Sequence, residues 1–303
     1  MGSNAKLVAA LYRSFLRNSK ILDASREFKA ILPREVHWGA GKKCDFYTTN
    51  VSCVETIRRE FREPKEPERL EKAIDDAITV NKAISERVHL LFKDDKDEEL
   101  LAVKKPTDMI TTTEKYEQEK RTRPPEEVKA LEKALELIKG ASTILANEQM
   151  EGPDRARIAK AYYRESINAF PTADAHAYLG WHYYLDGELE QAVAECERAI
   201  ELDPTFGNAY NDLALIRVQQ EQDDEAIELF TKAKVAARYD VRHFPSLNLA
   251  ALHLEKDRIK PALHEYIEAL HWMDEETATP IRNTVADMST FIVTLEEKLR
   301  ASA

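Results

Sequence analysis

Residues 173–206 read ADAHAYLGWHYYLDGELEQAVAECERAIELDPTF, and the order of residue types in this stretch decides the fold of the chain. Its regularly placed small, aromatic and turn-forming positions are Leu179-Gly180, Tyr183, Ala192, Cys196, Ala199 and Pro204. The alanine at position 192 recurs as Ala226 and Ala262, at spacings of 34 and then 36 residues. Glycine is scarce, with 8 in 303 residues. The repeated spacing therefore predicts consecutive pairs of helices and an all-α fold.

This pattern resembles the tetratricopeptide repeat, a helix-turn-helix unit of about 34 residues. In such a unit the small residues allow two helices to cross closely, and the proline ends the second helix. The resemblance implies an α-solenoid over residues 125–303. We expect repeats at about 140–172 (degenerate), 173–206, 207–242 and 243–276, followed by a capping helix at 280–299.

The resemblance also implies a concave face, lined by the first helix of each pair, that binds a client protein. The residues placed on this face are Trp181, Tyr184, Asn208, Asn211, Leu215, Val218, Phe244 and Leu247. Family members that hold the acidic C-termini of heat-shock chaperones use a lysine and asparagine clamp, but this chain has Ala177 and Asp212 at two clamp positions. We therefore expect an apolar or helical client segment. The alternative is that Trp181 and Tyr184 pack against the preceding degenerate repeat.

The apolar pattern of residues 1–93 predicts a separate bundle of three helices. In residues 7–17, apolar side chains recur at three- and four-residue spacing, as they do on one face of a helix. Similar stripes occupy residues 53–63 and, after a proline-containing break, residues 70–88. Residues 94–124 are highly charged and contain prolines, so we expect a linker with some helix there, in which the charge run at residues 94–99 is solvated.

Leu11-Tyr12-Arg13, followed by Ile57-Arg58-Arg59-Glu60-Phe61-Arg62 on the next clear helix, resembles the LYR-motif (complex I LYR-like) family over about residues 5–90. The resemblance implies binding of acylated acyl carrier protein, whose 4'-phosphopantetheine-linked acyl chain enters the bundle; the chain itself would hold no cofactor. The implied carrier and phosphopantetheine contacts are Tyr12, Arg13, Arg17, Arg58, Arg59 and Arg62. The implied lining of the acyl tunnel is Leu11, Phe15, Ile57, Phe61, Ile74 and Ile78. The connection between Ile21 and Cys53 is longer than this family usually has.

The charge of the chain is unevenly distributed. Residues 1–62 carry 12 basic and 6 acidic side chains, whereas the remainder carries 32 and 49, within a net charge of −11. An acidic chain argues against nucleic acid as the partner, and the basic N-terminal region favours an acidic protein. No apolar run reaches the length of about 18 residues that is typical of a membrane span. The three cysteines have no metal-binding spacing, and we expect no metal site.

No arrangement of histidine, cysteine or carboxylate residues is typical of a catalytic site, so we expect no enzyme activity. The two resemblances together imply a non-enzymatic assembly factor or adaptor, in which the bundle binds acyl carrier protein and the repeats bind a client. Its location would be the mitochondrial matrix or, alternatively, the plastid stroma, with clients from organellar complexes or iron–sulfur proteins. One alternative is a plain repeat scaffold with a purely structural bundle. Another is a catalytic subunit that uses His37 and Cys44.

Overall fold

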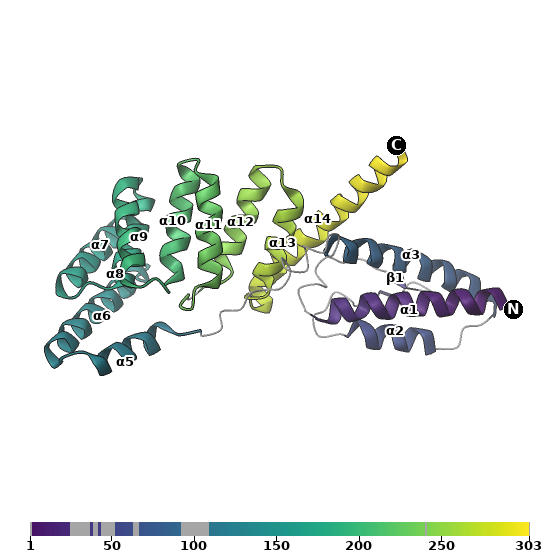
Figure 1. Ribbon diagram of the computed structural model, residues 1–303, viewed down its shortest axis with the longest axis horizontal. Coiled ribbons are helices and arrows are strands. Elements are labelled where there is room, and N and C mark those ends of the chain that lie inside the picture. Colours follow the sequence, from purple (N-terminus) through teal and green to yellow (C-terminus); the bar gives the residue numbers. More distant parts are fainter. Residues whose placement is uncertain are drawn as a thin grey trace. The chain divides into compact units, whose positions relative to one another are not determined.

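The computed structural model describes residues 2–24, 37–38, 42–43, 52–62, 67–91, 109–239 and 241–302 (Figure 1). It falls into two units: residues 1–103 with 250–303, and residues 104–249. In the described residues of both units helices predominate, and consecutive helices pack in pairs. This confirms the prediction of an all-α fold with a solenoid of helix pairs. No helix among these residues is long and apolar enough to cross a membrane.

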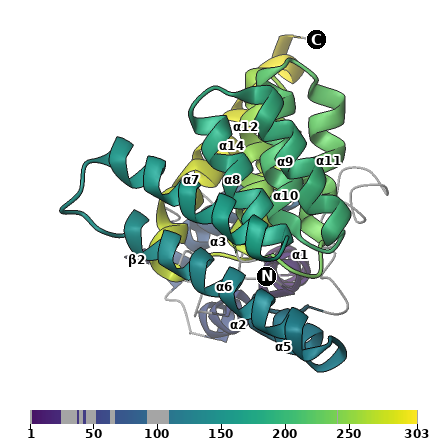
Figure 2. The same cartoon turned by 90° about the vertical axis from the view of Figure 1, so that its left-hand side faces the viewer.

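The unit of residues 104–249 contains consecutive helix pairs of the solenoid (Figure 2). Its helices are α5 (Thr112–Thr122), α6 (Pro125–Leu145), α7 (Gly152–Ala169), α8 (Ala173–Leu185), α9 (Leu189–Leu202), α10 (Gly207–Gln219), α11 (Asp223–Val235) and the first half of α12 (Phe244–Glu255). Helices α6 and α7, α8 and α9, and α10 and α11 pack as pairs. The first helices of two neighbouring pairs, α8 and α10, also contact each other.

The close packing of α8 on α9 explains the small residues of the repeat. A Cβ atom at Gly180 would lie 3.0 Å from Cys196 Sγ and 3.2 Å from the carbonyl oxygen of Ala192. Ala192 and Cys196 are themselves fully buried. A larger side chain at these positions would force the two helices apart, because the interior has no space to accept it.

The turn inside the helix pair has the same backbone geometry in three successive repeats. The backbone N–H of Glu188 donates to the carbonyl of Tyr183 (2.9 Å), and Gln222 and Arg258 make the equivalent bonds five residues back, at 2.8 Å each. The residue before each donor has a positive φ: Gly187 (78°), Glu221 (60°) and Asp257 (56°). The backbone geometry of the turn therefore recurs along the chain together with the side-chain pattern.

The other unit contains the N-terminal bundle. Its elements are α1 (Gly2–Ala24), β1 (His37–Trp38), β2 (Lys42–Lys43), α2 (Cys53–Arg62), α3 (Pro67–Leu91), the second half of α12, α13 (Ile259–Leu270) and α14 (Glu275–Ser302). Helix α1 packs on both α2 and α3, which forms the predicted bundle of three helices. The carboxylate of Asp23 accepts hydrogen bonds from the backbone N–H groups of Cys53 (2.8 Å) and Val54 (2.9 Å). The end of α1 therefore caps the beginning of α2.

Part of the predicted linker is helical. Helix α5 begins after Thr111, whose hydroxyl accepts a hydrogen bond from the backbone N–H of Glu114 (3.2 Å), while the Glu114 carboxylate accepts one from the Thr111 N–H (2.8 Å). This reciprocal capping box stabilises the start of a helix even in a highly charged segment. Tyr116 of α5 is buried, so this helical part of the predicted linker packs on the repeats. Residues 92–108 and Cys44 lie outside the described residues.

Two details of the unit formed by residues 1–103 and 250–303 also differ from the sequence predictions. Ile78, expected to line the bundle core, is 41% exposed. The buried stripe of α3 follows Ile74, Ala77 and Ile84, and Ile78 points about 100° away from Ala77 around the helix. The predicted capping helix at 280–299 is longer, since α14 already begins at Glu275, where the Asp274 carboxylate accepts a hydrogen bond from the N–H of Thr277 (2.8 Å).

Candidate functional site

Helices α8 and α10 carry a strip of side chains that are mostly in part exposed to solvent. We call it the α8–α10 strip; it consists of Trp181, Tyr184, Asn208, Asn211, Asp212, Leu215 and Val218. All of these side chains are partly exposed except Asn211, which is buried. On α10 they recur at three- and four-residue spacing, so they share one face of the helix. The strip contains all six groove residues that the sequence predicts on these two helices.

Trp181 and Tyr184 form the aromatic part of the strip. Their rings stack, with 5.3 Å between the centroids and 29° between the planes. Other side chains of α8 make the ring contacts with the preceding pair, since Tyr178 and His182 lie 5.6 and 5.8 Å from Tyr163 of α7. We therefore favour the interpretation that Trp181 and Tyr184 are available to a ligand over the alternative that they pack against the degenerate repeat.

Two asparagines connect α10 to the beginning of α12. Asn248 Nδ2 donates to Asn211 Oδ1 (3.0 Å), and Asn211 Nδ2 donates to Asp212 Oδ1 (3.2 Å). These bonds orient the Asn211 amide and make the Asp212 carboxylate the last acceptor of the series. On α12, the predicted groove residue Leu247 is half-buried and Phe244 is 46% exposed.

Asp212 and Asn208 are acceptors with few partners of their own. Among the described residues no basic side chain pairs with Asp212, whose hydrogen bond comes from Asn211. Burial raises the pKa of Asp212 to about 7, although the Asn211 hydrogen bond opposes this shift. One helical turn earlier, Asn208 Oδ1 is buried and accepts no hydrogen bond from the described part of the chain. Nor does any group of three or more His, Cys, Asp or Glu in that part have the arrangement of a metal site.

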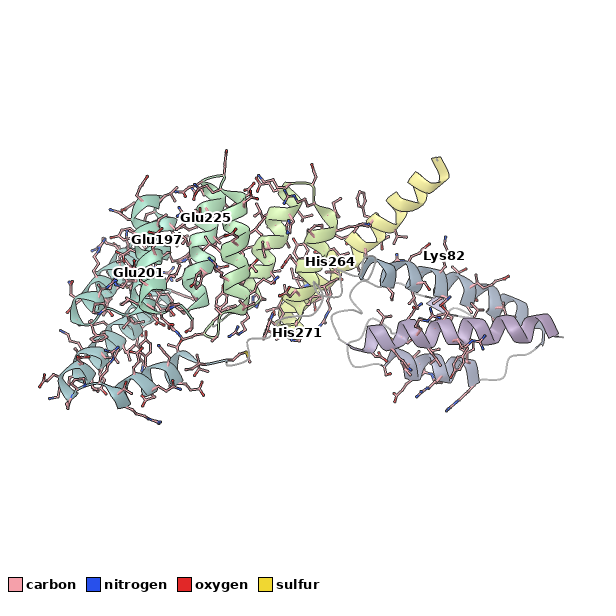
Figure 3. The ribbon with its side chains drawn as sticks, in the orientation of Figure 1. Lys82, Glu197, Glu201, Glu225, His264 and His271 are labelled. Carbon is pink, nitrogen blue, oxygen red and sulfur yellow. The ribbon has the colours of Figure 1, made fainter. Side chains whose placement is uncertain are left out.

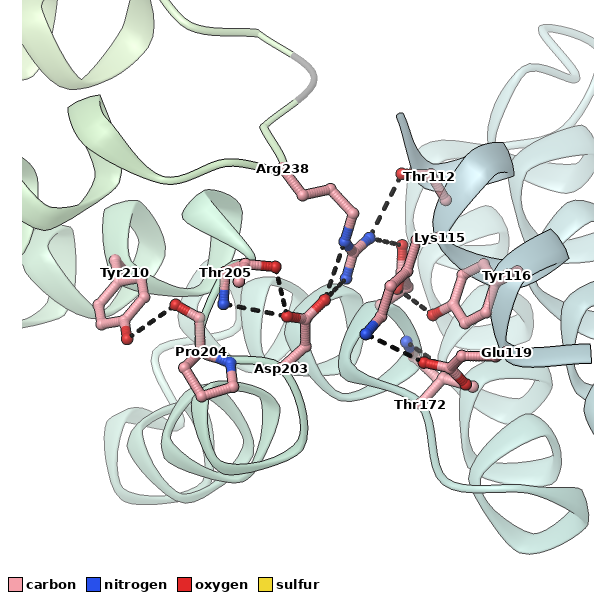
Figure 4. A network of polar contacts seen from close by, with 12 residues as sticks. Thr112, Lys115, Tyr116, Glu119, Thr172, Asp203, Pro204, Thr205, Tyr210 and Arg238 are labelled. Atoms are coloured by element: carbon pink, nitrogen blue, oxygen red, sulfur yellow. Dashed lines mark hydrogen bonds and ion pairs between the residues drawn. The ribbon is translucent and has the colours of Figure 1, made fainter. Parts of the chain in front are cut away.

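A second set of buried charges is centred on Arg238, in the connection between α11 and α12 (Figure 4). Arg238 is 1% exposed and donates from Nη1 to Asp174 Oδ1 (2.8 Å) and from Nε to Asp203 Oδ2 (3.0 Å). Asp174 also accepts a hydrogen bond from the phenol of Tyr116. The guanidinium lies 3.8 Å from the centre of the Phe206 ring. Arg238 therefore joins α5, the beginning of α8 and the end of α9.

The contacts within this network keep Asp203 and Arg238 charged and Tyr116 neutral. Burial alone would raise the pKa of Asp203, but hydrogen bonds from Thr205 and the charge of Arg238 bring the pKa below its usual value. Burial lowers the pKa of Arg238, and the charge of Asp174 more than offsets this effect. Burial and the Asp174 carboxylate raise the pKa of Tyr116, so its phenol remains a neutral donor.

The Arg238 network was not predicted, although the sequence contains a signal for it. The connection between α11 and α12 spans residues 236–243, whereas the connection between α9 and α10 spans only residues 203–206. The connection is four residues longer, but helices α11 and α12 are each one residue shorter than α9 and α10, so the period changes by two, from 34 to 36 residues. Within it the backbone N–H of Arg238 donates to the carbonyl of Thr205 (3.0 Å), and the N–H of Gly207 donates to the carbonyl of Arg238 (2.7 Å).

Comparisons with known proteins concern the same helices. The tetratricopeptide repeat family matches residues 173–206 and, in a second match, residues 195–228. The chain contains tetratricopeptide repeats. The entire α8–α10 strip lies within these matches. The chain is also similar to Protein STIP1 homolog of Dictyostelium discoideum, with 32% identity over 97 residues, which covers 30% of this chain but only 17% of that protein.

The tetratricopeptide matches do not include the N-terminal bundle, where the predicted carrier contacts lie on α1 and α2. Tyr12 is half-buried, and its ring centroid lies 5.0 Å from that of Phe61, which in turn lies 5.8 Å from Phe15. The exposed arginines of α1 and α2 are Arg13, Arg17, Arg58, Arg59 and Arg62. Buried residues of the predicted acyl tunnel are Leu11, Phe15, Ile57 and Ile74. The fold thus brings Tyr12 and Phe61 together where α1 packs on α2.

Proposed function

We propose that the chain is a non-enzymatic interaction scaffold whose α8–α10 strip binds a segment of a partner protein. The observation that carries this proposal is the exposure of the strip, in which apolar and amide side chains share one face of two adjacent repeat helices. The matches to the tetratricopeptide repeat support it, because they cover every residue of the strip.

The strip has the side chains that such binding needs. Trp181, Tyr184, Leu215 and Val218 supply apolar surface, and complete burial of a side chain of this size stabilises a complex by about 1.5–3 kcal/mol. Aromatic anchors of this kind often dominate the binding free energy of an interface. The Asn208 amide can pair with the backbone of a bound segment. We therefore expect a short segment with at least one apolar anchor.

Selection from a library of random peptides displayed on phage tests the proposal. The complete chain is the target, and the variant with both Trp181→Ala and Leu215→Asn is the comparison. We expect the selected peptides to bind this variant at least about 10-fold more weakly, because it loses two apolar anchors of the strip. Binding is measured by fluorescence anisotropy of labelled peptides.

Val235→Asn is the matched control, because it removes an apolar side chain that is 46% exposed but lies on α11, outside the strip. This variant should bind the peptides as the unaltered chain does. If no peptide is selected, or if all three proteins bind the selected peptides equally, the proposal is wrong. Thermal melting by circular dichroism confirms that each variant is folded.

We also propose that the bundle of α1, α2 and α3 binds acylated acyl carrier protein. The observation in favour is the set of exposed arginines beside the half-buried Tyr12 and Phe61. Guanidinium groups hold carboxylates and phosphates in a bidentate manner, which suits an acidic carrier and its phosphopantetheine. With this second partner the chain would be an assembly factor of the mitochondrial matrix, or of the plastid stroma, and the strip would hold its client.

Intact-mass analysis tests this second function on protein purified from a host that contains acyl carrier protein. We expect an acylated carrier in roughly equal amount with the chain, and loss of that carrier in Arg13→Glu. Lys20→Glu is the matched control, since Lys20 is an exposed basic residue of α1 outside the predicted contacts. Absence of the carrier from a folded preparation would leave the bundle with a structural role alone.

A further inference from the structure

We infer that the α8–α10 strip selects a partner segment that contains a lysine or arginine, and that the cationic group of this residue pairs with Asp212. The inference rests on the proposed function and specifies the chemistry of the bound segment. It is carried by two acceptors on one face of α10, the Asp212 carboxylate and the Asn208 amide oxygen, and by the charges around them.

The Asp212 carboxylate has no counter-ion in the part of the chain that the structure describes. Its hydrogen bond from the neutral Asn211 amide, at 3.2 Å, does not neutralise the charge. Because the site is partly desolvated, the ionised carboxylate is destabilised, which is the reason its pKa lies near 7. A cation that entered the strip would remove this penalty and gain a charge-assisted hydrogen bond.

The neighbouring charges also favour a cation. Burial raises the pKa of the Cys196 thiol, and the charges of Asp212 and of Glu195 and Glu197 on α9 raise it further, so these three carboxylates act on the same buried group. Glu197 is engaged by Arg217 (3.5 Å) and Glu195 by His176 (2.6 Å). Asp212 is therefore the carboxylate of these three that has no basic partner among the described residues. A cation that enters the strip would pair with it, whereas an acidic segment would be repelled.

The Oδ1 atom of Asn208 favours a ligand that donates several hydrogen bonds. This buried oxygen accepts none from the described residues, and an unsatisfied buried acceptor destabilises the free protein. Asn208 and Asp212 are four residues apart and hence neighbours on the helix surface. A lysine ammonium has three donors and an arginine guanidinium five, so one basic side chain has enough donors for both acceptors.

The aromatic residues of α8 suit the same ligand. Lysine and arginine carry their charge on an aliphatic stem that packs on apolar surface. The stacked Trp181 and Tyr184 offer such a surface on the helix that contacts α10, and aromatic faces also attract cations. The strip as a whole thus combines a carboxylate, an amide oxygen and aromatic rings, and none of its residues is basic.

Parallel peptide selections test this inference. The same random library is selected on the unaltered chain, on Asp212→Asn, and on Glu201→Gln as the matched control. Glu201 lies on α9 (Figure 3), outside the strip, with 65% of its side chain exposed and an ion pair to Arg198 (2.7 Å). We expect lysine or arginine to be enriched at one position of the peptides from the unaltered chain and from Glu201→Gln, and this enrichment to disappear with Asp212→Asn.

The most enriched peptide is then synthesised with lysine, glutamine or glutamate at the enriched position. The unaltered chain should bind the lysine form about 10-fold more tightly than the glutamine form, and Asp212→Asn should bind the two within about 2-fold. Selected peptides without a basic preference, or a preference that survives in Asp212→Asn, would overturn the inference while the proposed function stands. Failure to select any peptide would contradict both.

Discussion

Asp174 and Asp212 are carboxylates on the first helices of neighbouring repeats, yet their surroundings are opposite. Asp174 is 2% exposed and is neutralised by Arg238 at 2.8 Å, with a further hydrogen bond from Tyr116. Asp212 has the Asn211 amide at 3.2 Å and no counter-ion among the described residues. The difference arises because the longer connection at residues 236–243 supplies Arg238 to one site and not to the other. The ion pair of Asp174 stabilises the fold, whereas the carboxylate of Asp212 is the one that our inference assigns to a ligand.

The largest effect should follow from Arg238→Met, which leaves Asp174 and Asp203 buried without their counter-ion. Loss of one partner of a buried ion pair typically costs about 3–5 kcal/mol, and we expect a loss of this order in the free energy of unfolding. Urea denaturation followed by circular dichroism measures it. As a control, Asp174→Asn and Asp203→Asn added to Arg238→Met should recover part of the loss. An unchanged unfolding midpoint would show that the network does not stabilise the repeats.

Asp212→Asn should instead increase the free energy of unfolding, by an amount that depends on pH. The folded-state pKa of Asp212 is about 7, above its ordinary value of 3.8, so the folded chain holds this proton more tightly than the unfolded chain does. The resulting stabilisation is complete below about pH 4 and is lost as the pH rises through 7. Near pH 8 we therefore expect the variant to be more stable by on the order of 2 kcal/mol, with a smaller difference near pH 5. Melting temperatures at both pH values measure this, and an equal difference at both would contradict it.

Tyr116→Phe should have a smaller effect on the paired site. It removes the phenol that donates to Asp174 but leaves the ring and the Arg238 pair in place. Loss of one hydrogen bond to a charged acceptor costs about 1.5–3 kcal/mol, and we expect a value at the lower end of this range. Tyr162→Phe, at a half-buried tyrosine of α7, is the control and should unfold at the same urea concentration as the unaltered chain. Equal midpoints for the two variants would mean that α5 gains nothing from the bond.

Arg217→Met should have the smallest effect. Its partners Glu197 and Glu225 have side chains that are about half exposed, so water screens these ion pairs. Exposed pairs contribute about 0–1 kcal/mol, and we expect the free energy of unfolding to change by no more than that. A loss as large as that of Arg238→Met would show that the number of ion pairs, and not their burial, determines their contribution.

Local patterns in the sequence account for the elements that were predicted correctly. Gly180, Ala192 and Cys196 must be small because α8 and α9 cross there, and this requirement is readable from spacing alone. The capping box of Thr111 and Glu114 was equally readable, but the surrounding charge led to the prediction of a linker. Ile78 shows the limit of such patterns: spacing places it near the apolar stripe of α3, but only packing decides that this stripe passes through Ala77 and Ile84.

The sequence by itself determined the period, the helix pairs and the residue types along the strip, because these depend on contacts between residues close in the chain. Tertiary structure alone decided which charges are neutralised. Arg238 is 64 residues from Asp174 and 126 from Thr112 in the sequence, and no local pattern relates them. Whether a carboxylate is paired depends on which distant side chain the fold places beside it, since Coulomb attraction in a buried site acts over a few ångströms of space and not along the chain. The same physical reason leaves Asp212 without a counter-ion among the residues that the structure describes.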